Sequence, residues 1–296
     1  MAAISNTTPP SGFFSDWETH RAEENLSLEP ISSVSSGITC LLKSRAGGRI
    51  RLYKVLTPEH RDNMLYESIL RKEFEIGFSL THPGICAYYA YTPLDTYGNA
   101  IELEWVEGCT LREWLHTNPS RARRSAILDE LLDALAYMHR KQVIHRDLKP
   151  ENIMVTYQGE HVKIIDFGFS DSDSHIINKG AAGTRAYAAP ELLQNGTADE
   201  RSDIWSIGVI MEELVPHLSH IANRCRAKEP CKRYQNIPEL QRAIARRKKM
   251  WIIPSCITVI LAAVLAWHFR TFGDNAVDGL VRQAEEAISI AISLSE

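Results

Sequence analysis

Hydrophobic and polar residues alternate along the chain from residue 37 to residue 56, with a break at Ala46-Gly47-Gly48. Alternation with a period of two is typical of strands with one buried face, and glycines between two such runs predict a hairpin turn. The second run, 49–56, carries Lys54 between Tyr53 and Val55. Because an unpaired charge in an apolar setting costs free energy, the pattern predicts a carboxylate partner for this lysine.

The next apolar pattern contains a carboxylate that fits this role. Residues 61–80 carry apolar side chains at helical spacing, and Glu73 lies in this run, nineteen positions after Lys54. Glu67 and Glu75 lie in the same run, and the spacing of nineteen that favours Glu73 over them is the one implied by the family resemblance given below. The alternative is a solvated lysine on an edge strand, which needs no partner.

Further patterns predict the elements that follow. Alternation over 101–108 predicts another strand, and helical spacing over 111–115 and 126–139 predicts two helices. An arginine cluster precedes the second helix, and we expect a solvated turn there rather than a substrate-docking site. The cluster consists of Arg121, Arg123 and Arg124.

The most apolar run covers residues 251–269 and contains no acidic or strongly basic side chain. A helix of this length reaches about 28 Å at about 1.5 Å per residue, close to the thickness of the hydrocarbon core. Trp251 and Trp267 lie near its ends, where aromatic residues gather at membrane interfaces. The run is predicted to be a transmembrane helix. The alternative is a buried core helix with a basic lead-in.

The charges that flank this run are asymmetric. Asp274 and Asp278 follow it, whereas a basic cluster precedes it. Positive residues favour the cytoplasmic side, so the preceding chain is expected in the cytoplasm and the C-terminus outside it, as a single-pass membrane protein. Apolar positions at helical spacing over 277–291 predict a short amphipathic helix in the tail. The basic cluster consists of Arg242, Arg246, Arg247, Lys248 and Lys249.

Composition adds mainly exclusions. The net charge of −4 and the 24% of charged residues show no polyanion-binding character, so we expect no nucleic-acid partner. The six cysteines have neither CxxC pairs nor zinc-ligand spacing and are expected to be reduced thiols. Residues 1–27 are polar and lack the apolar core of a signal peptide, which predicts a flexible N-terminal segment.

Two short motifs carry the chemistry. His145-Arg146-Asp147 is followed by Lys149 and Asn152, and Asp166-Phe167-Gly168 comes fourteen positions after Asn152. Asp147 is suited to accept the proton of an attacking hydroxyl, and Lys149 to neutralise the phosphate being transferred. Asn152 and Asp166 offer hard oxygen ligands for Mg²⁺, which bridges nucleotide phosphates. The motifs therefore predict phosphoryl transfer from ATP.

The sequence around these motifs resembles the eukaryotic-type Ser/Thr protein kinase family over roughly residues 30–243. The run 183–191, which reads Gly-Thr-Arg-Ala-Tyr-Ala-Ala-Pro-Glu, is similar to the end of the family's activation segment. The resemblance implies that Asp203 supports the catalytic loop and that Arg233 pairs with Glu191. Phosphorylation in the activation segment would fall on Ser170, Ser172, Ser174 or Thr184.

The resemblance also implies a fold and a set of nucleotide contacts. The fold is α+β with two lobes: a small β-rich lobe with one key helix, and a larger helical lobe shortened after the helix that carries Asp203. A C-terminal transmembrane helix is added to it. Lys54, oriented by Glu73, would hold the α- and β-phosphates. Leu103 would be the gatekeeper of the adenine site. The nucleotide would also contact Gly37 and the backbone of Glu104 to Val106.

The chain departs from the family in two places. The loop that covers the nucleotide reads Ser32-Ser33-Val34-Ser35-Ser36-Gly37, and only its last glycine remains. Glycines in such a loop let backbone N–H groups approach the phosphates, so the affinity for ATP is open. The second departure is the short stretch from Asp203 to Arg233, which leaves little room for the region that docks protein substrates in the family.

We therefore expect a membrane-tethered Ser/Thr protein kinase with protein substrates, similar to bacterial receptor-like Ser/Thr kinases. A pseudokinase scaffold and a small-molecule kinase are the alternatives. The span and the tail also offer a route to a homodimer. The expected segments are a flexible start (1–27), a kinase domain (28–243, with lobes 28–105 and 106–243), a basic juxtamembrane segment (244–250), the span (251–269) and an extracytoplasmic tail (270–296).

Overall fold

The structure is a computed structural model of the chain. It describes residues 28–35, 37–46, 48–167, 186–193, 198–247, 260–267, 270, 282, 283 and 285. The chain divides into two compact units, Met1–Glu239 and Leu240–Glu296. The predicted N-terminal segment and the four candidate phosphorylation sites lie outside the described residues.

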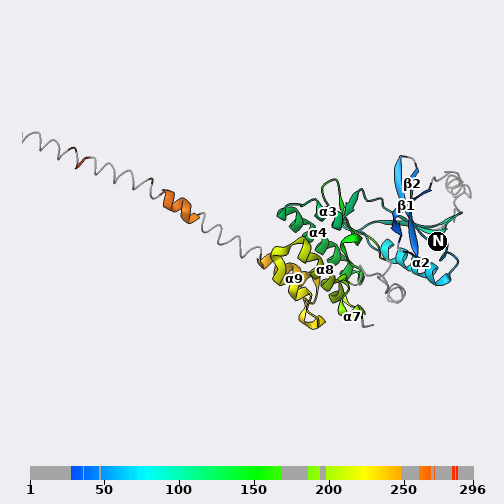
Figure 1. Cartoon of the computed structure of the whole chain (residues 1–296). Coiled ribbons are helices and arrows are strands. Elements are labelled where there is room, and N and C mark those ends of the chain that lie inside the picture. The colour runs from blue at the N-terminus through cyan, green and yellow to red at the C-terminus, as the bar shows by residue number, and fades with distance from the viewer. Residues whose placement is uncertain are drawn as a thin grey trace, which may run out of the picture. The chain divides into compact units, whose positions relative to one another are not determined.

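The first unit begins with a five-stranded antiparallel sheet in the order β1-β2-β3-β5-β4 (Figure 1). The predicted hairpin is confirmed, because Ala46 at the end of β2 pairs with Arg49 at the start of β3. Gly48 in this turn has φ of 76°, a conformation that favours glycine. The strands are β1 (Leu28–Ser35), β2 (Thr39–Ala46), β3 (Arg49–Leu56), β4 (Tyr88–Leu94) and β5 (Gly98–Leu103).

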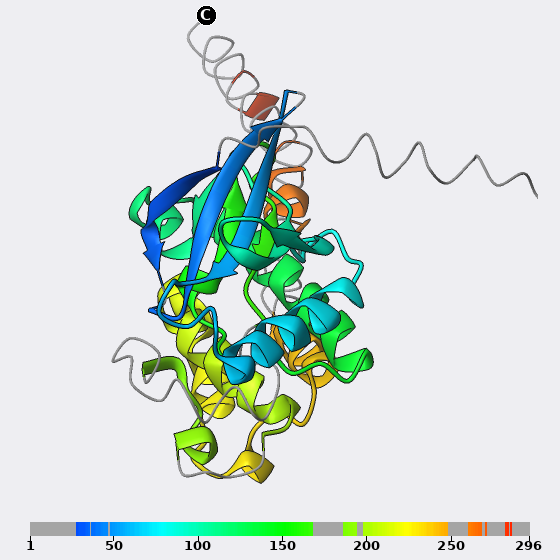
Figure 2. The same cartoon turned by 90° about the vertical axis from the view of Figure 1, so that its right-hand side faces the viewer.

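Helix α2 (Met64–Phe78) packs against this sheet and is seen beside the blue strands in Figure 2. It is shorter than the predicted run 61–80. The side chain of Asn63 accepts a hydrogen bond from the backbone N–H of Leu65 and so caps the helix at its start. The helix carries Glu73 on the face that is buried.

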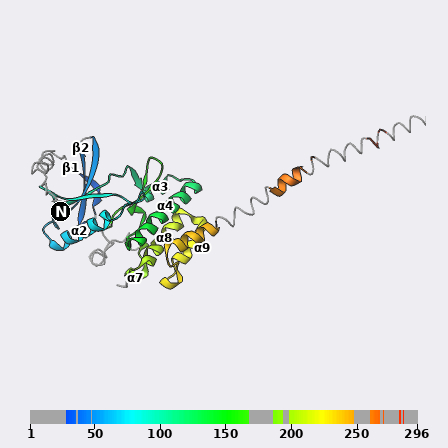
Figure 3. The ribbon, with the colours of Figure 1, turned by 180° about the vertical axis from the view of Figure 1, so that it is seen from behind.

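The larger lobe is helical, with a three-stranded sheet in the order β6-β7-β8 on the side of the smaller lobe (Figure 3). The two lobes match the expected α+β architecture. The strands are β6 (Gly108–Thr110), β7 (Ile153–Thr156) and β8 (Val162–Ile164). The helices and single turns are α3 (Leu111–His116), α4 (Arg121–Arg140), η1 (Pro150–Asn152), α7 (Pro190–Leu193), α8 (Glu200–Leu214), η2 (Pro216–Leu218), α9 (Ser219–Cys225) and η3 (Pro230–Lys232).

The arginine cluster is largely solvent-exposed, as predicted, but it is helical, and the prediction of a turn is wrong. Helix α4 begins at Arg121, because the hydroxyl of Ser120 caps it by accepting from the backbone N–H of Arg123. The cluster therefore forms the first turn of α4. The guanidinium of Arg123 forms an ion pair of 2.9 Å with Glu160.

The short connection after α8 is filled by the single turn η2 and the seven-residue helix α9. Helix α9 packs tightly on α8 at Gly208. A Cβ atom at Gly208 would lie 2.6 Å from the Cβ of Cys225 and 3.0 Å from the carbonyl oxygen of Ala222. Glycine is therefore needed here for close helix packing.

In the second unit, residues 240–247 and 260–267 are helical. The latter are the described part of the predicted span 251–269, and their side chains are exposed. Within the described part of the chain, no helix combines the length and apolar character needed to cross a bilayer. Most of the predicted tail lies outside the described residues.

Candidate active site

The predicted pair between Lys54 on β3 and Glu73 on α2 is present. The Nζ of Lys54 donates to Glu73 Oε1 at 2.7 Å and Oε2 at 2.8 Å, and to Asp166 Oδ1 at 2.8 Å. Burial by itself would lower the pKa of Lys54, but the charges of Asp166 and Glu73 raise it well above its usual value. Lys54 is therefore a firmly protonated cation at the point where strand, helix and metal-binding loop meet.

The loop after α4 brings together the predicted proton acceptor and its neighbours. The Nζ of Lys149 donates to Asp147 Oδ2 at 2.7 Å, and the side-chain amide of Asn152 donates to the same oxygen at 3.0 Å. Asn152 also donates to the backbone carbonyl of Asp147 at 2.9 Å. Two donors thus fix the carboxylate of Asp147, which is buried.

Asp203 on α8 fixes the backbone of this loop through hydrogen bonds. Its carboxylate accepts the backbone N–H groups of His145 and Arg146, each at 2.9 Å, and Nε2 of His139 lies 2.8 Å from it. Burial would raise the pKa of Asp203, but these hydrogen bonds and the charge of His139 hold it below its usual value. Arg146 and Asp166 adopt positive φ values of 65° and 67°, a strained conformation that clusters at functional sites.

A second support lies at the end of the activation segment. The guanidinium of Arg233 donates to both carboxylate oxygens of Glu191, at 2.7 and 2.8 Å. The burial of Arg233 is complete, and Trp205 lies 5.0 Å from it in a cation–π contact. The pairing of Arg233 with Glu191 that the resemblance implied is therefore present.

A cavity of about 350 Å³ opens beside Lys54 and Asp166. It is largely apolar, as expected for a site that takes an adenine ring. Gly37 lies in the turn between β1 and β2 and does not line it. Neither Asp147 nor Lys149 lines it. The predicted residues that line it are Lys54, Glu73, Leu103, Glu104, Val106, Asn152 and Asp166.

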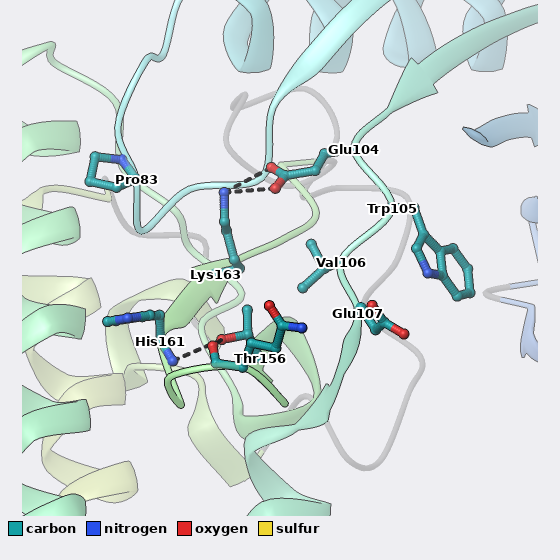
Figure 4. A pocket seen from close by; sticks show the side chains of 9 residues that line it. Pro83, Glu104, Trp105, Val106, Glu107, Thr156, His161 and Lys163 are labelled. Atoms are coloured by element: carbon teal, nitrogen blue, oxygen red, sulfur yellow. Dashed lines mark hydrogen bonds and ion pairs between the residues drawn. The ribbon is translucent and has the colours of Figure 1, made fainter. Parts of the chain in front are cut away.

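The segment after β5 lines this cavity and also a second pocket, in which the side chains of Glu104 and Lys163 face each other (Figure 4). There the Glu104 carboxylate lies 2.8 Å from the Nζ of Lys163 on β8 and accepts the N–H of Ala87 at 3.0 Å. The N–H of Glu104 itself donates to the carbonyl of Ala87. Within the described residues, the N–H of Val106 has no internal acceptor and is free to meet a ligand.

The donor set suits Mg²⁺. Asn152 uses its amide nitrogen for Asp147, which leaves the amide oxygen for a metal ion, and Asp166 offers a carboxylate. No group of three or more His, Cys, Asp or Glu side chains within the described residues is arranged to hold a metal. The remaining ligands would come from the nucleotide phosphates and water, as is usual for Mg²⁺.

Three contacts near the site were not predicted from the sequence. The hydroxyl of Tyr88 donates to Glu73 Oε1 at 3.0 Å, and Lys163 pairs with Glu104. Arg112 on α3 contacts Glu151 beside the catalytic loop. No local motif marks these residues, because each partner is distant in sequence.

Fold and site together define the class of protein: a two-lobed kinase fold with the side chains that phosphoryl transfer requires. The chain belongs to the protein kinase family, and the family model for the protein kinase domain matches residues 29–269.

The named relatives agree with this family. Aurora kinase B of Xenopus tropicalis is 34% identical over 188 residues, which cover 63% of this chain and 52% of the relative. Aurora kinase C of Mus musculus is 37% identical over 188 residues, which cover 63% of this chain and 67% of the relative. The chain thus spans about half the length of the first curated relatives it matches.

A solved structure shows the same fold. The crystal structure of the Mycobacterium tuberculosis PknI kinase domain matches with a TM-score of 0.56 at 20% identity, covering 72% of this chain and 92% of that chain.

Proposed function

We propose that this chain is a Ser/Thr protein kinase that transfers the γ-phosphoryl group of ATP to hydroxyl groups of protein substrates. The observation that carries the proposal is the set of contacts that joins Lys54 to Glu73 and Asp166, together with the carboxylate of Asp147 fixed by its own hydrogen bonds. In this proposal Lys54 is the phosphate-binding cation and Asp166 the metal-binding carboxylate, both in the lining of the cavity, and Asp147 is the base on the neighbouring loop. Lys149 after the base fits the Ser/Thr-specific pattern.

Each residue has a distinct part in the reaction. Asp147 accepts the proton of the attacking hydroxyl at its carboxylate, while Lys149 stabilises the charge of the phosphoryl group in transit. Lys54 holds the α- and β-phosphates, and Glu73 keeps Lys54 in place. Asn152 and Asp166 would hold Mg²⁺, which when bound bridges the phosphates and neutralises their charge.

Replacing Lys54 by Met is expected to lower kcat/KM by about 10²-fold, because a buried cation aimed at the phosphates is lost. Transfer of label from γ-labelled ATP to a generic protein substrate with Mg²⁺ measures the effect, and phosphoamino-acid analysis tests for Ser and Thr. Lys141→Met, at the exposed end of α4, is the matched control and should retain the wild-type rate. A wild-type chain without transfer and without thermal stabilisation by Mg-ATP would point to a pseudokinase scaffold.

We propose further that residues 251–269 tether the kinase to a membrane, with the kinase domain on the cytoplasmic side. The apolar run, its aromatic ends and the preceding basic cluster support this proposal. Over its described part the run is helical, and its apolar side chains are more than half exposed. They include Ile260 (61%), Leu261 (56%), Val264 (54%) and Leu265 (56%). A homodimer through the span or tail stays a prediction.

The full chain is expected to sediment with membranes and to need detergent for extraction. The double variant Leu261→Arg, Leu265→Arg should be released from the membrane, since each charge at the centre of a span costs about 2.5–3.5 kcal/mol. Ala262→Leu is the apolar control and should leave the chain in the membrane fraction. Wild-type chain that stays in the supernatant of a high-speed spin without detergent would contradict the tether.

A further inference from the structure

Tyr88 on β4 occupies a space that exists because residue 77 on α2 is glycine. A Cβ atom at Gly77 would lie 2.5 Å from Cγ of Tyr88 and 2.6 Å from both Cδ atoms of its ring. Real Cβ atoms do not approach a ring so closely. Gly77 lies inside a regular helix, so glycine is required here for space rather than for backbone conformation.

The ring placed over Gly77 brings the Tyr88 hydroxyl to the carboxylate that holds Lys54. The hydroxyl donates to Glu73 Oε1 at 3.0 Å, and the same oxygen accepts from Lys54 at 2.7 Å. Both partners are almost completely buried, with exposures of 6% for Tyr88 and 3% for Glu73. Hydrogen bonds to a desolvated charge are among the stronger ones.

The other side of the ring contacts the metal-binding loop. Its centroid lies 5.5 Å from that of Phe167, which directly follows Asp166 and is buried. Phe167 in turn lies 5.7 Å from the ring of His145, at the start of the catalytic loop. Packing therefore fixes the plane of the Tyr88 ring, and a fixed ring fixes the direction of its hydroxyl.

The charges around Glu73 explain why a further donor matters. Lys54 is shared between the carboxylates of Glu73 and Asp166, and burial raises the pKa of Glu73 above its usual value. The thiol of Cys86 also lines this part of the cavity, and its pKa is raised to about 12. Tyr88 is protonated as well, since burial raises its pKa well above the usual value. It therefore supplies a neutral donor to Glu73 beside the cation of Lys54.

We propose that Tyr88 is a positioning residue for phosphotransfer: its hydroxyl fixes the Glu73 carboxylate in the orientation that holds Lys54, and Gly77 makes this contact possible. The inference rests on the proposed kinase function. It adds a residue to the machinery that neither the sequence motifs nor the charge pattern marks.

The first test is Tyr88→Phe in the full chain, which keeps the ring and removes only the hydroxyl. Losing a hydrogen bond to a buried carboxylate is expected to lower kcat roughly five- to tenfold. The KM for ATP should change less than about twofold, because Lys54 keeps its charge and its ion pair with Glu73 and can still bind the phosphates. Tyr89→Phe, whose side chain is exposed, is the matched control and should behave as wild type.

A second background separates positioning from packing. In Glu73→Gln, the neutral amide gains little from the hydroxyl, so adding Tyr88→Phe should change kcat by less than about twofold. Gly77→Ala should lower both Tm and kcat by displacing the ring. Adding Tyr88→Leu to Gly77→Ala should restore Tm and leave kcat low.

The outcomes tell two failures apart. A wild-type chain without phosphotransfer overturns the proposed function. In that case the hydrogen bond can still be tested by denaturant unfolding. Tyr88→Phe should lower the unfolding midpoint when residue 73 is Glu, and should not lower it in the Glu73→Gln background. With an active wild type, an unchanged kcat in Tyr88→Phe, or an equal loss in both backgrounds, overturns the role of Tyr88.

Discussion

Asp147→Asn is expected to lower the rate of phosphotransfer by about 10³-fold or more while the fold is retained, since positioned general bases contribute up to about 10⁴-fold. The carboxylate accepts hydrogen bonds from Lys149 and Asn152 through one oxygen. An amide keeps the shape of this group and has no basic oxygen to take the proton of a hydroxyl. The loss should appear in kcat, with the KM for ATP nearly unchanged.

Single-turnover transfer of label, with Mg-ATP binding followed in parallel, measures this effect. Asp95→Asn, in the exposed turn between β4 and β5, is the matched control and should retain full activity. An Asp147→Asn protein that still transfers phosphate at a rate within tenfold of wild type would show that Asp147 is not the base.

Arg233→Met is expected to destabilise the kinase domain by about 3–5 kcal/mol, the usual result of removing one partner of a buried ion pair. The guanidinium donates to Glu191 and also to the backbone carbonyls of Ala227, Arg201 and Lys228. Methionine fills much of the volume and satisfies none of these acceptors. The loss is mainly the cost of leaving a carboxylate and three carbonyls without their donor.

Denaturant unfolding followed by circular dichroism measures the change in the free energy of unfolding. Arg224→Met is the control: Arg224 forms a half-exposed ion pair with Glu239 and should cost less than about 1 kcal/mol. Arg233→Met with Glu191→Gln should be less destabilised than Arg233→Met alone, because the buried charge is removed as well. Equal midpoints for wild type and Arg233→Met would contradict the structural role of Arg233.

The parts of the fold that the sequence predicts well are those with local signals. The hairpin over 37–56 is marked by alternation and by glycines at the turn. A lysine in an apolar strand predicts a carboxylate partner, and the family resemblance identifies that partner as Glu73. The contacts of Asp203 and Arg233 also agree with what the family resemblance implies. Each of these features is written into a short stretch of sequence or a known motif.

The parts that were missed depend on distant partners or on a cap. The start of α4 is set by one hydroxyl, that of Ser120, which the apolar pattern does not register. The ion pair between Glu104 and Lys163 forms only because β8 lies beside the segment that follows β5. The space above Gly77 exists only once α2 lies on β4. Such contacts follow from packing and carry no signal of their own in the sequence.

The catalytic residues of the two lobes are held in place in different ways. The proton acceptor stands on a loop whose backbone is bonded directly to α8, deep in the larger lobe. Lys54 and Glu73 depend instead on how α2 rests against a small sheet. A change that shifts α2 is therefore expected to affect the binding of the nucleotide phosphates by Lys54 before it affects Asp147. The position of the base is therefore fixed, and changes in the rate of phosphotransfer are expected to come from the lobe that carries Lys54 and Glu73.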